Sequence, residues 1–205
     1  MKDYPSILSS NGQNFTEFKA HVFDKLDGSN LRFEWAKKSS WFKYGTRTRL
    51  FDESDEVFGS AISLFHNTLA EPLERIAIDN NWKHLIIYAE WFGPSSFAGN
   101  HIETEEKELV LFDVAADKKG IMGPKDFLKL FDKVKIPNYL GMHNWTRGFV
   151  DKIRNNELEG VTFEGVIGKA GEGHKLIMRK AKTQVWVDAV RARYTSEEAE
   201  KLIKS

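Results

Sequence analysis

An Asp-Gly dipeptide at positions 27 and 28 stands between two segments of strand-like sequence, HVFDKL and NLRFEW. In the second segment apolar residues alternate with charged ones, which is typical of a strand with one buried face. Asp-Gly between two such segments is a strong short-range signal for a β-hairpin. The pattern therefore predicts two antiparallel strands here, with Lys25 at the end of the first, just before the turn.

The rest of the chain alternates between strand and helix patterns without a βαβ rhythm. Apolar residues keep helical spacing from Val57 to Asn80, where Pro72 is expected to bend or split the helix. WFKYGTRTRLF is expected to form a strand pair, or a strand and a loop. Further strands are predicted at HLIIYAE, ELVLFDVAA, GVTFEGVIGK and HKLIMRKAKTQVWV, and further helices at GPKDFLKLFDKV and TSEEAEKLIKS. The predicted fold class is α+β, with antiparallel β-sheets flanked by helices in a single domain over residues 1–205.

Composition narrows the function classes. The formal net charge is zero, so the whole chain does not have the charge of a general polyanion binder. Cysteine is absent, which excludes disulfides, thiol catalysis and cysteine-based metal sites. The first ten residues lack a signal-peptide core, and no apolar run has membrane-spanning length, so a cytoplasmic protein is expected. No glycine-rich phosphate loop follows a strand, which argues against P-loop and dinucleotide folds.

Lys25 is the first candidate for chemistry, because a lysine amine held rigidly at a strand end can act as a nucleophile. Such an amine must be neutral to attack, and burial or nearby cations would have to lower its pKa from about 10.4. The same residues also fit a plain hairpin that carries a solvated lysine.

Lys180 and Lys182 are two residues apart, so on a strand they share a face with Met178. An inward face that runs from apolar residues into cations is suited to an anion such as a phosphate. The alternative is a strand that leaves the core for water.

Three more residues stand out in predicted strands. Glu164 precedes a glycine in an apolar segment, where a carboxylate must be paired or bind a metal. Glu90 ends a buried strand and either accepts hydrogen bonds from ribose hydroxyls or reaches water. Phe112 either stacks on a nucleobase or belongs to the core.

Taken in chain order, these segments resemble the covalent nucleotidyltransferase superfamily, which includes ATP-dependent RNA and DNA ligases and mRNA capping enzymes. KLDGSN resembles the first motif of that superfamily, from Lys25 to Asn30. YGTRTRLF, YAEWFG, LFD, EGVIGK and RKAK resemble the motifs that follow, in the correct order. The resemblance spans residues 23–183 and implies an ATP-grasp-like adenylation domain.

The resemblance also implies roles for individual residues. Lys25 would attack the α-phosphorus of ATP to form lysyl-AMP, with Mg²⁺ or Mn²⁺ as the metal cofactor. The other implied assignments are Asp24 near the adenine, Asn30 and Arg47 near the phosphate and the nucleic-acid end, Glu90 at the ribose, Phe112 against the adenine, Glu164 at the metal, and Lys180 and Lys182 at the α-phosphate.

The end of the chain favours RNA over DNA as the implied substrate. DNA ligases and capping enzymes usually carry an OB-fold domain after the fifth motif, and only about twenty residues follow Lys182 here. An ATP-dependent RNA ligase that joins polynucleotide ends is therefore expected, and a partner is one possible source of the missing nucleic-acid-binding domain. A non-catalytic nucleotide- or RNA-binding module, a DNA ligase and a guanylyltransferase remain the alternatives. Cations beside aromatics in WFKYGTRTR suit a single-stranded end, or else a core strand with a solvated face.

Overall fold

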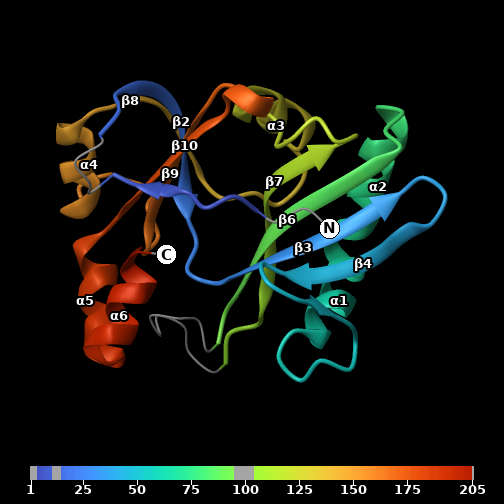
Figure 1. The fold of residues 1–205 in the computed structure, drawn as a ribbon, viewed down its shortest axis with the longest axis horizontal. Helices are drawn as coiled ribbons and strands as arrows, with labels where there is room; N and C mark the ends of the chain where they lie inside the picture. The colour runs from blue at the N-terminus through green and yellow to red at the C-terminus, as the bar shows by residue number, and fades with distance from the viewer. Residues whose placement is uncertain (1–3, 11–14, 95–103, 205) are drawn as a thin grey trace.

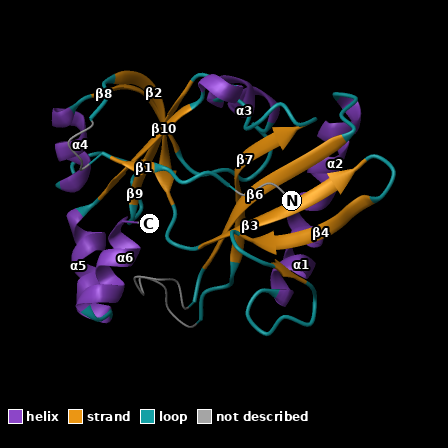
Figure 2. Cartoon of the chain, in the orientation of Figure 1, coloured by secondary structure: helices purple, strands orange, loops and turns teal. Residues whose placement is uncertain are grey.

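The computed structural model describes residues 4–10, 15–94 and 104–204. Two five-stranded sheets, called sheet A and sheet B, lie side by side and are flanked by helices (Figures 1 and 2). Sheet A has the order β1-β10-β9-β2-β8, with β1 (Leu8–Ser9), β10 (Ile177–Lys182), β9 (Gly165–Ala170), β2 (Phe18–Lys25) and β8 (Tyr139–Trp145). Sheet B has the order β5-β4-β3-β6-β7, with β5 (Leu50–Phe51), β4 (Ser40–Thr46), β3 (Ser29–Ala36), β6 (His84–Phe92) and β7 (Glu108–Ala116).

Strand pairing is antiparallel in both sheets except between β1 and β10, which run parallel. The helices are α1 (Gly59–Phe65), α2 (Glu71–Asp79), α3 (Pro124–Leu130), α4 (Arg147–Arg154), α5 (Gln184–Arg193) and α6 (Ser196–Lys204). A π-helical segment, His66–Ala70, joins α1 to α2, and a short 3₁₀ turn covers Gly173–Lys175. The predicted α+β class with antiparallel sheets and flanking helices is confirmed.

The predicted hairpin around the Asp-Gly dipeptide is wrong. Strand β2 pairs with β8 and β9 in sheet A, whereas β3 pairs with β4 and β6 in sheet B. The turn therefore carries the chain from one sheet to the other. Gly28 packs against β6 so closely that a Cβ there would lie 2.6 Å from the carbonyl oxygen of Trp91. A glycine is needed at position 28 because the turn lies so close to β6. Lys25 is the last residue of β2, in the sheet opposite β3.

Sheet B has its main apolar core on the side covered by α1 and α2. Alternate residues of β3, namely Leu31, Phe33 and Trp35, are almost fully buried there. Phe33 stacks on Phe65 of α1 with ring centroids 4.1 Å apart. The alternation in NLRFEW therefore identified the apolar side of β3 correctly, but the expectation of one buried face was wrong, because Arg32 and Glu34 on the other side are also buried.

Sheet A packs its outer face against α4. Ala20 and Val22 of β2 contact Phe149 and Ile153 of the helix in one buried cluster. A third cluster, which contains Tyr4, Tyr88 and Met178, joins the inner faces of the two sheets. Helices thus cover the outer face of each sheet, and the inner faces of sheets A and B face each other.

Among the other predicted helices and strands, some are confirmed and others are wrong or were missed. The helical region after Val57 is interrupted as expected, and α2 carries Pro72 in its first turn. The predicted strand HKLIMRKAKTQVWV ends at Lys182, because Thr183 caps the N-terminus of α5. Strand β8 and helix α4 were not predicted. Within the described ranges, no helix has the length and apolar character needed to cross a membrane.

Candidate active site

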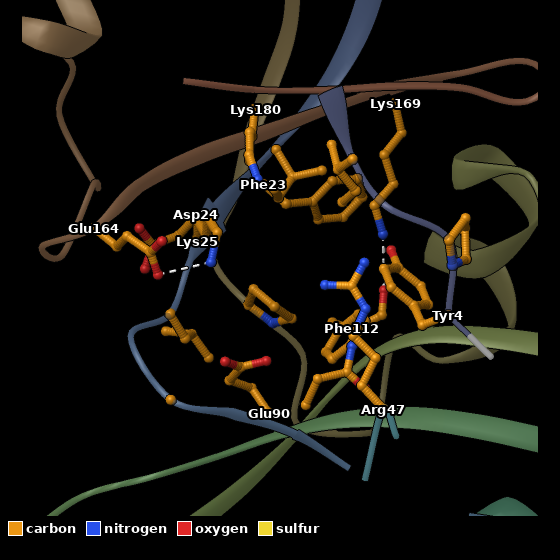
Figure 3. A pocket seen from close by; sticks show the side chains of 17 residues that line it. Tyr4, Phe23, Asp24, Lys25, Arg47, Glu90, Phe112, Glu164, Lys169 and Lys180 are labelled. Carbon is orange, nitrogen blue, oxygen red and sulfur yellow. Dashed lines mark hydrogen bonds and ion pairs between the residues drawn. The ribbon is translucent and has the colours of Figure 1, made fainter. Parts of the chain in front are cut away.

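A cavity lies between the inner faces of the two sheets, and 17 residues line it (Figure 3). They come from the N-terminal segment, from strands of both sheets and from neighbouring loops. Eight of the nine residues singled out in the sequence line this cavity: Asp24, Lys25, Asn30, Arg47, Glu90, Phe112, Glu164 and Lys180. The fold therefore brings together residues that are up to 156 positions apart in the chain, counted from Asp24 to Lys180.

Strand register explains how the lysines meet. Across β2, β9 and β10, Lys25 pairs with Gly165, which in turn pairs with Lys182. One row further along the same face, Ile167 of β9 pairs with Lys180 of β10. Because side chains in one row of a sheet point to the same side, the three lysines share the inner face of sheet A. Lys180 is 2% exposed, so this is not a strand leaving the core for water.

Glu164 is the carboxylate that connects two of these lysines. The ammonium of Lys25 donates to Glu164 Oε2 at 2.7 Å, and Lys182 Nζ lies 3.3 Å from Oε1. Glu164 is 4% exposed, and a carboxylate buried this deeply needs partners for its charge. The two lysines are those partners. Lys182 is the one predicted site residue that does not line the cavity; its ammonium contacts Glu164 and donates to the carbonyl oxygen of Leu202.

The electrostatic setting of Lys25 differs from the expectation of a neutral amine. Burial lowers the pKa of Lys25, but Glu164, Glu90 and Asp27 raise it by more, so the pKa lies above its ordinary value. In the absence of nucleotide, the lysine is therefore an ammonium paired with Glu164. Neutralising the nearby carboxylates is a condition for using it as a nucleophile.

The other two lysines have pKa values below the ordinary value for lysine. Burial, followed by repulsion from Lys182 and Lys25, lowers the pKa of Lys180 to about 8. Burial also lowers the pKa of Lys182, with Lys25 adding to the effect and Glu164 opposing it. Burial makes the charged form of both lysines less favourable, and an anion bound beside them would offset this free-energy cost.

Sheet B supplies the opposite wall of the cavity. Asn30 of β3 pairs in register with Glu90 of β6. Burial raises the pKa of Glu90 to about 8, with help from Glu164 and Asp27 and against the effect of Lys25. At neutral pH this carboxyl group carries a proton, so it can both donate and accept hydrogen bonds, as recognition of a sugar hydroxyl requires. Arg47 lines the same wall and donates a hydrogen bond to the Ser6 hydroxyl of the N-terminal segment.

Two predicted residues have structural partners as well as a place in the cavity. Both carboxylate oxygens of Asp24 accept hydrogen bonds from Thr162, from its backbone N at 3.0 Å and its hydroxyl at 2.7 Å. Burial raises the pKa of Asp24, and these bonds oppose the shift. Phe112 packs edge-on against Tyr4, with ring centroids 5.1 Å apart. Phe112 is partly buried, so its ring belongs to the cavity wall as well as to the core cluster between the sheets.

Sequence reasoning missed a buried polar cluster at the far end of the cavity. Lys169 Nζ lies 2.7 Å from Asp113 Oδ1 and 2.9 Å from the carbonyl oxygen of Phe112. The Tyr4 hydroxyl donates to the other oxygen of Asp113. Lys169 has the same strand parity as Ile167, so the alternation in GVIGK carried a usable signal. The N-terminal segment gave no comparable signal for Tyr4.

The segment WFKYGTRTR has more core character than the interleaved cations suggested. Trp41 is buried and packs edge-on against Phe65. Tyr44 packs on Phe33, and among the three aromatics at positions 41, 42 and 44 it is Phe42 that is exposed, at 43%. The core-strand alternative therefore accounts for most of this segment.

The described residues contain no group of three or more His, Cys, Asp or Glu side chains that could hold a metal ion by themselves. Glu164 does place one carboxylate on the cavity. Mg²⁺ commonly binds to one or two carboxylates together with substrate phosphates and water. The site thus fits a divalent ion that arrives with a phosphate-bearing substrate.

Two sequence comparisons with known proteins gave one match. The sequence profile of the RNA ligase family matches residues 19–187, which include β2 through the first turn of α5. A search of the curated proteins found no match.

Solved structures share the fold at low sequence identity. A Naegleria gruberi RNA ligase variant with ATP and Mn is 18% identical with a TM-score of 0.62, covering 83% of this chain and 51% of that one. The same RNA ligase with PPi is 17% identical with a TM-score of 0.63, covering 85% and 52%. An archaeal ATP-dependent RNA ligase is 14% identical with a TM-score of 0.68, covering 100% and 56%.

The chain thus spans about half the length of these solved ligases. The matched region includes every candidate residue from Asp24 to Lys182, and the fold places nearly all of them around one cavity. By its sequence profile and its fold, the chain belongs to the RNA ligase family.

Proposed function

We propose that residues 1–205 form an adenylation domain that works as an ATP-dependent RNA ligase through a covalent lysyl-AMP intermediate on Lys25. The observation that carries this proposal is the arrangement of Lys25, Lys180 and Lys182 on one sheet face around Glu164. Phosphoryl transfer depends mainly on positioning and on neutralising developing charge, and this arrangement supplies both.

In the first step the deprotonated amine of Lys25 attacks the α-phosphorus of ATP. A P–N bond forms, the P–O bond to the β-phosphate breaks, and pyrophosphate leaves with the bonding electrons. Lys180 faces the cavity as a buried cation and would contact the α-phosphate. Glu164 would hold Mg²⁺ or Mn²⁺, which supplies charge neutralisation at the phosphates when bound.

The remaining contacts orient the nucleotide. Glu90 would accept and donate hydrogen bonds at the ribose, and Phe112 would pack against the adenine, with Asp24 close to the base. Asn30 and Arg47 would lie at the phosphates and at the incoming end. The AMP would then move from Lys25 to the 5′-phosphate of an RNA end, and attack by a 3′-hydroxyl would release AMP and seal the strand.

Covalent labelling tests the first step. Incubation with α-³²P-ATP and Mg²⁺ should give a labelled protein band that acid removes, because P–N bonds are acid-labile. Lys25→Ala should abolish the band. Lys19→Ala is the matched control, since Lys19 is an exposed lysine on the same strand and the same side of β2. Labelled Lys25→Ala protein would refute the assigned nucleophile.

Two further arms separate the alternatives. A capping-type guanylyltransferase would take label from α-³²P-GTP and not from ATP. A non-catalytic nucleotide-binding module would bind ATP saturably and give no adduct. Transfer of the label to a 5′-phosphorylated RNA, compared with the same DNA sequence, then tests the substrate.

A further inference from the structure

Trp186 lies between Lys182 and the turn that follows Lys25. It is 2% exposed and belongs to the first turn of α5, directly after β10. Its indole N–H donates to Asp27 Oδ1 at 3.0 Å, and its ring centroid lies 4.0 Å from Lys182 Nζ. One side chain therefore contacts both the turn that follows Lys25 and the ammonium of Lys182.

The orientation of Trp186 is fixed by the start of its helix. Thr183 is the N-cap of α5, and its hydroxyl accepts from the backbone N of Trp186 at 3.1 Å. The same hydroxyl donates to the carbonyl oxygen of Phe163 at 2.6 Å, and the backbone N of Thr183 donates to that of Glu164 at 2.9 Å. This cap ties the first turn of α5 to the strand entry that carries Glu164.

Lys182 is enclosed on three sides. Its ammonium lies 3.3 Å from Glu164 Oε1, donates to the carbonyl oxygen of Leu202 in α6 at 2.9 Å, and lies over the face of Trp186. Lys182 is 6% exposed. A buried lysine side chain has many rotamers to lose, so its ammonium is held in place only as long as these partners stay.

We propose that Trp186 is a positioning residue for adenylylation, which acts by holding Lys182 beside Glu164 and by fixing the Asp27 turn next to Lys25. The inference rests on the proposed function and adds to it a residue that follows the RKAK motif. The ring face stabilises the ammonium of Lys182 in addition to Glu164, and the indole N–H fixes the ring edge against Asp27. Removal of the ring frees Lys182 and leaves the side chains of Lys25, Lys180 and Glu164 in the protein.

Single-turnover labelling of the full chain with α-³²P-ATP tests this role. Trp186→Leu removes the ring and should lower the rate constant of labelling by roughly ten- to thirty-fold, the size expected for a desolvated cation–π contact. Trp186→Phe keeps an aromatic face and loses only the N–H, so its loss should be smaller. The dissociation constant of ATP should change less than the rate constant in both variants.

A double-mutant cycle distinguishes positioning from general damage. If Trp186 acts through Lys182, Trp186→Leu should cost less than about three-fold when added to Lys182→Ala. Trp35 is the matched control, because it is 1% exposed and its indole N–H donates to Glu74 Oε1 at 2.8 Å, on the helix-covered side of sheet B. Trp35→Leu and Trp35→Phe should lower the melting temperature and leave the rate constant within about two-fold.

A measurement on the nucleotide-free protein gives a second readout. The ε-methylene protons of Lys182, assigned by their absence in Lys182→Arg, should be shifted upfield by the indole ring current. The shift should vanish in Trp186→Leu and persist in part in Trp186→Phe. This signal needs no activity, so it decides the contact even where Trp186→Leu folds too poorly for kinetics.

The proposal is overturned if folded Trp186→Leu labels at the wild-type rate, if its cost is the same with and without Lys182, or if the wild-type Lys182 protons resonate at ordinary positions. A wild-type protein that takes no label refutes the proposed function instead. The ring-current measurement then still reports on the contact between Trp186 and Lys182.

Discussion

The ammonium group of Lys25 lies 2.7 Å from Oε2 of Glu164, the carboxylate that also pairs with a second lysine of the same sheet face. This contact holds the proposed nucleophile in its charged form, because the surrounding carboxylates outweigh the effect of burial on the pKa of Lys25. Binding of a metal ion at Glu164 would remove that carboxylate from Lys25. Under the proposed mechanism, activation of the amine and arrival of the metal-bound nucleotide would therefore be coupled through one side chain.

Glu164→Gln should lower the pKa of Lys25, since Glu164 makes the largest contribution that raises it while burial acts in the opposite direction. Competitive modification of amines at a series of pH values, read by mass spectrometry, measures this pKa without nucleotide. The midpoint for Lys25 should move to lower pH in Glu164→Gln. The exposed Lys19 on the same strand is the control for a general change in amine reactivity. An unchanged Lys25 midpoint would contradict the electrostatic role given to Glu164.

Much of the site followed from local patterns in the sequence, because strand parity decides which side chains share a face. The two-residue spacing of Lys180 and Lys182 correctly predicted one inward cationic face. The buried position of Glu164 in its apolar segment also followed from the sequence. Each of these inferences needs only the alternation of a single strand.

Relationships between strands were beyond the sequence patterns. Asp27–Gly28 has the composition of a hairpin turn, but β2 and β3 do not pair with each other. Strand β2 pairs with β9, and β3 pairs with β6. Local turn chemistry carries no information about which sheet the next strand enters. For the same reason the charge state of Lys25 was mispredicted, because it depends on Glu164 and Glu90, which tertiary packing brings to it.

Lys180→Met should stabilise the protein at neutral pH while it impairs labelling. The folded pKa of Lys180, about 8, is below its ordinary value, so the folded state binds its proton less tightly than the unfolded state. The resulting destabilisation is fully present below about pH 8 and is lost as the pH rises toward 10.4. Removing the charge should therefore gain about 3 kcal/mol at pH 7 and less than about 1 kcal/mol near pH 10.

Urea unfolding of Lys180→Met at pH 7 and pH 10 measures this difference. Lys175→Met, at an exposed lysine of the preceding turn, should change stability little at either pH. A gain that is independent of pH would mean that the methionine packs better, without any contribution from the buried charge.

Lys169→Met should destabilise the protein strongly, because it leaves Asp113 as a buried charge without its ammonium partner. Lys169 and Asp113 are 3% and 1% exposed, and their charged atoms are 2.7 Å apart. Breaking a buried pair from one side costs about 3–5 kcal/mol. Adding Asp113→Asn should recover part of that loss in urea unfolding. Lys135→Met breaks an exposed pair with Glu108 and should cost less than about 1 kcal/mol.

Gly165→Ala should disrupt the row that connects Lys25 to Lys182. Gly165 has φ +146°, and a Cβ there would lie 2.0 Å from the carbonyl oxygen of Ala181. Strands β9 and β10 would have to separate to relieve this overlap, so we expect a loss of about 3 kcal/mol or more, together with loss of labelling.

Gly148→Ala is the matched control for that substitution. Gly148 lies in α4, and a Cβ there would meet nothing within 4 Å. Because alanine favours a helix over glycine, this variant should gain up to about 1 kcal/mol and label at the wild-type rate. The melting temperature and the labelling rate of the two variants show the effect of the same added methyl group at a crowded position and at an open one. Equal stability of Gly165→Ala and wild type would show that β9 and β10 can part without cost, and the row of paired residues would then not be what holds the lysines in place.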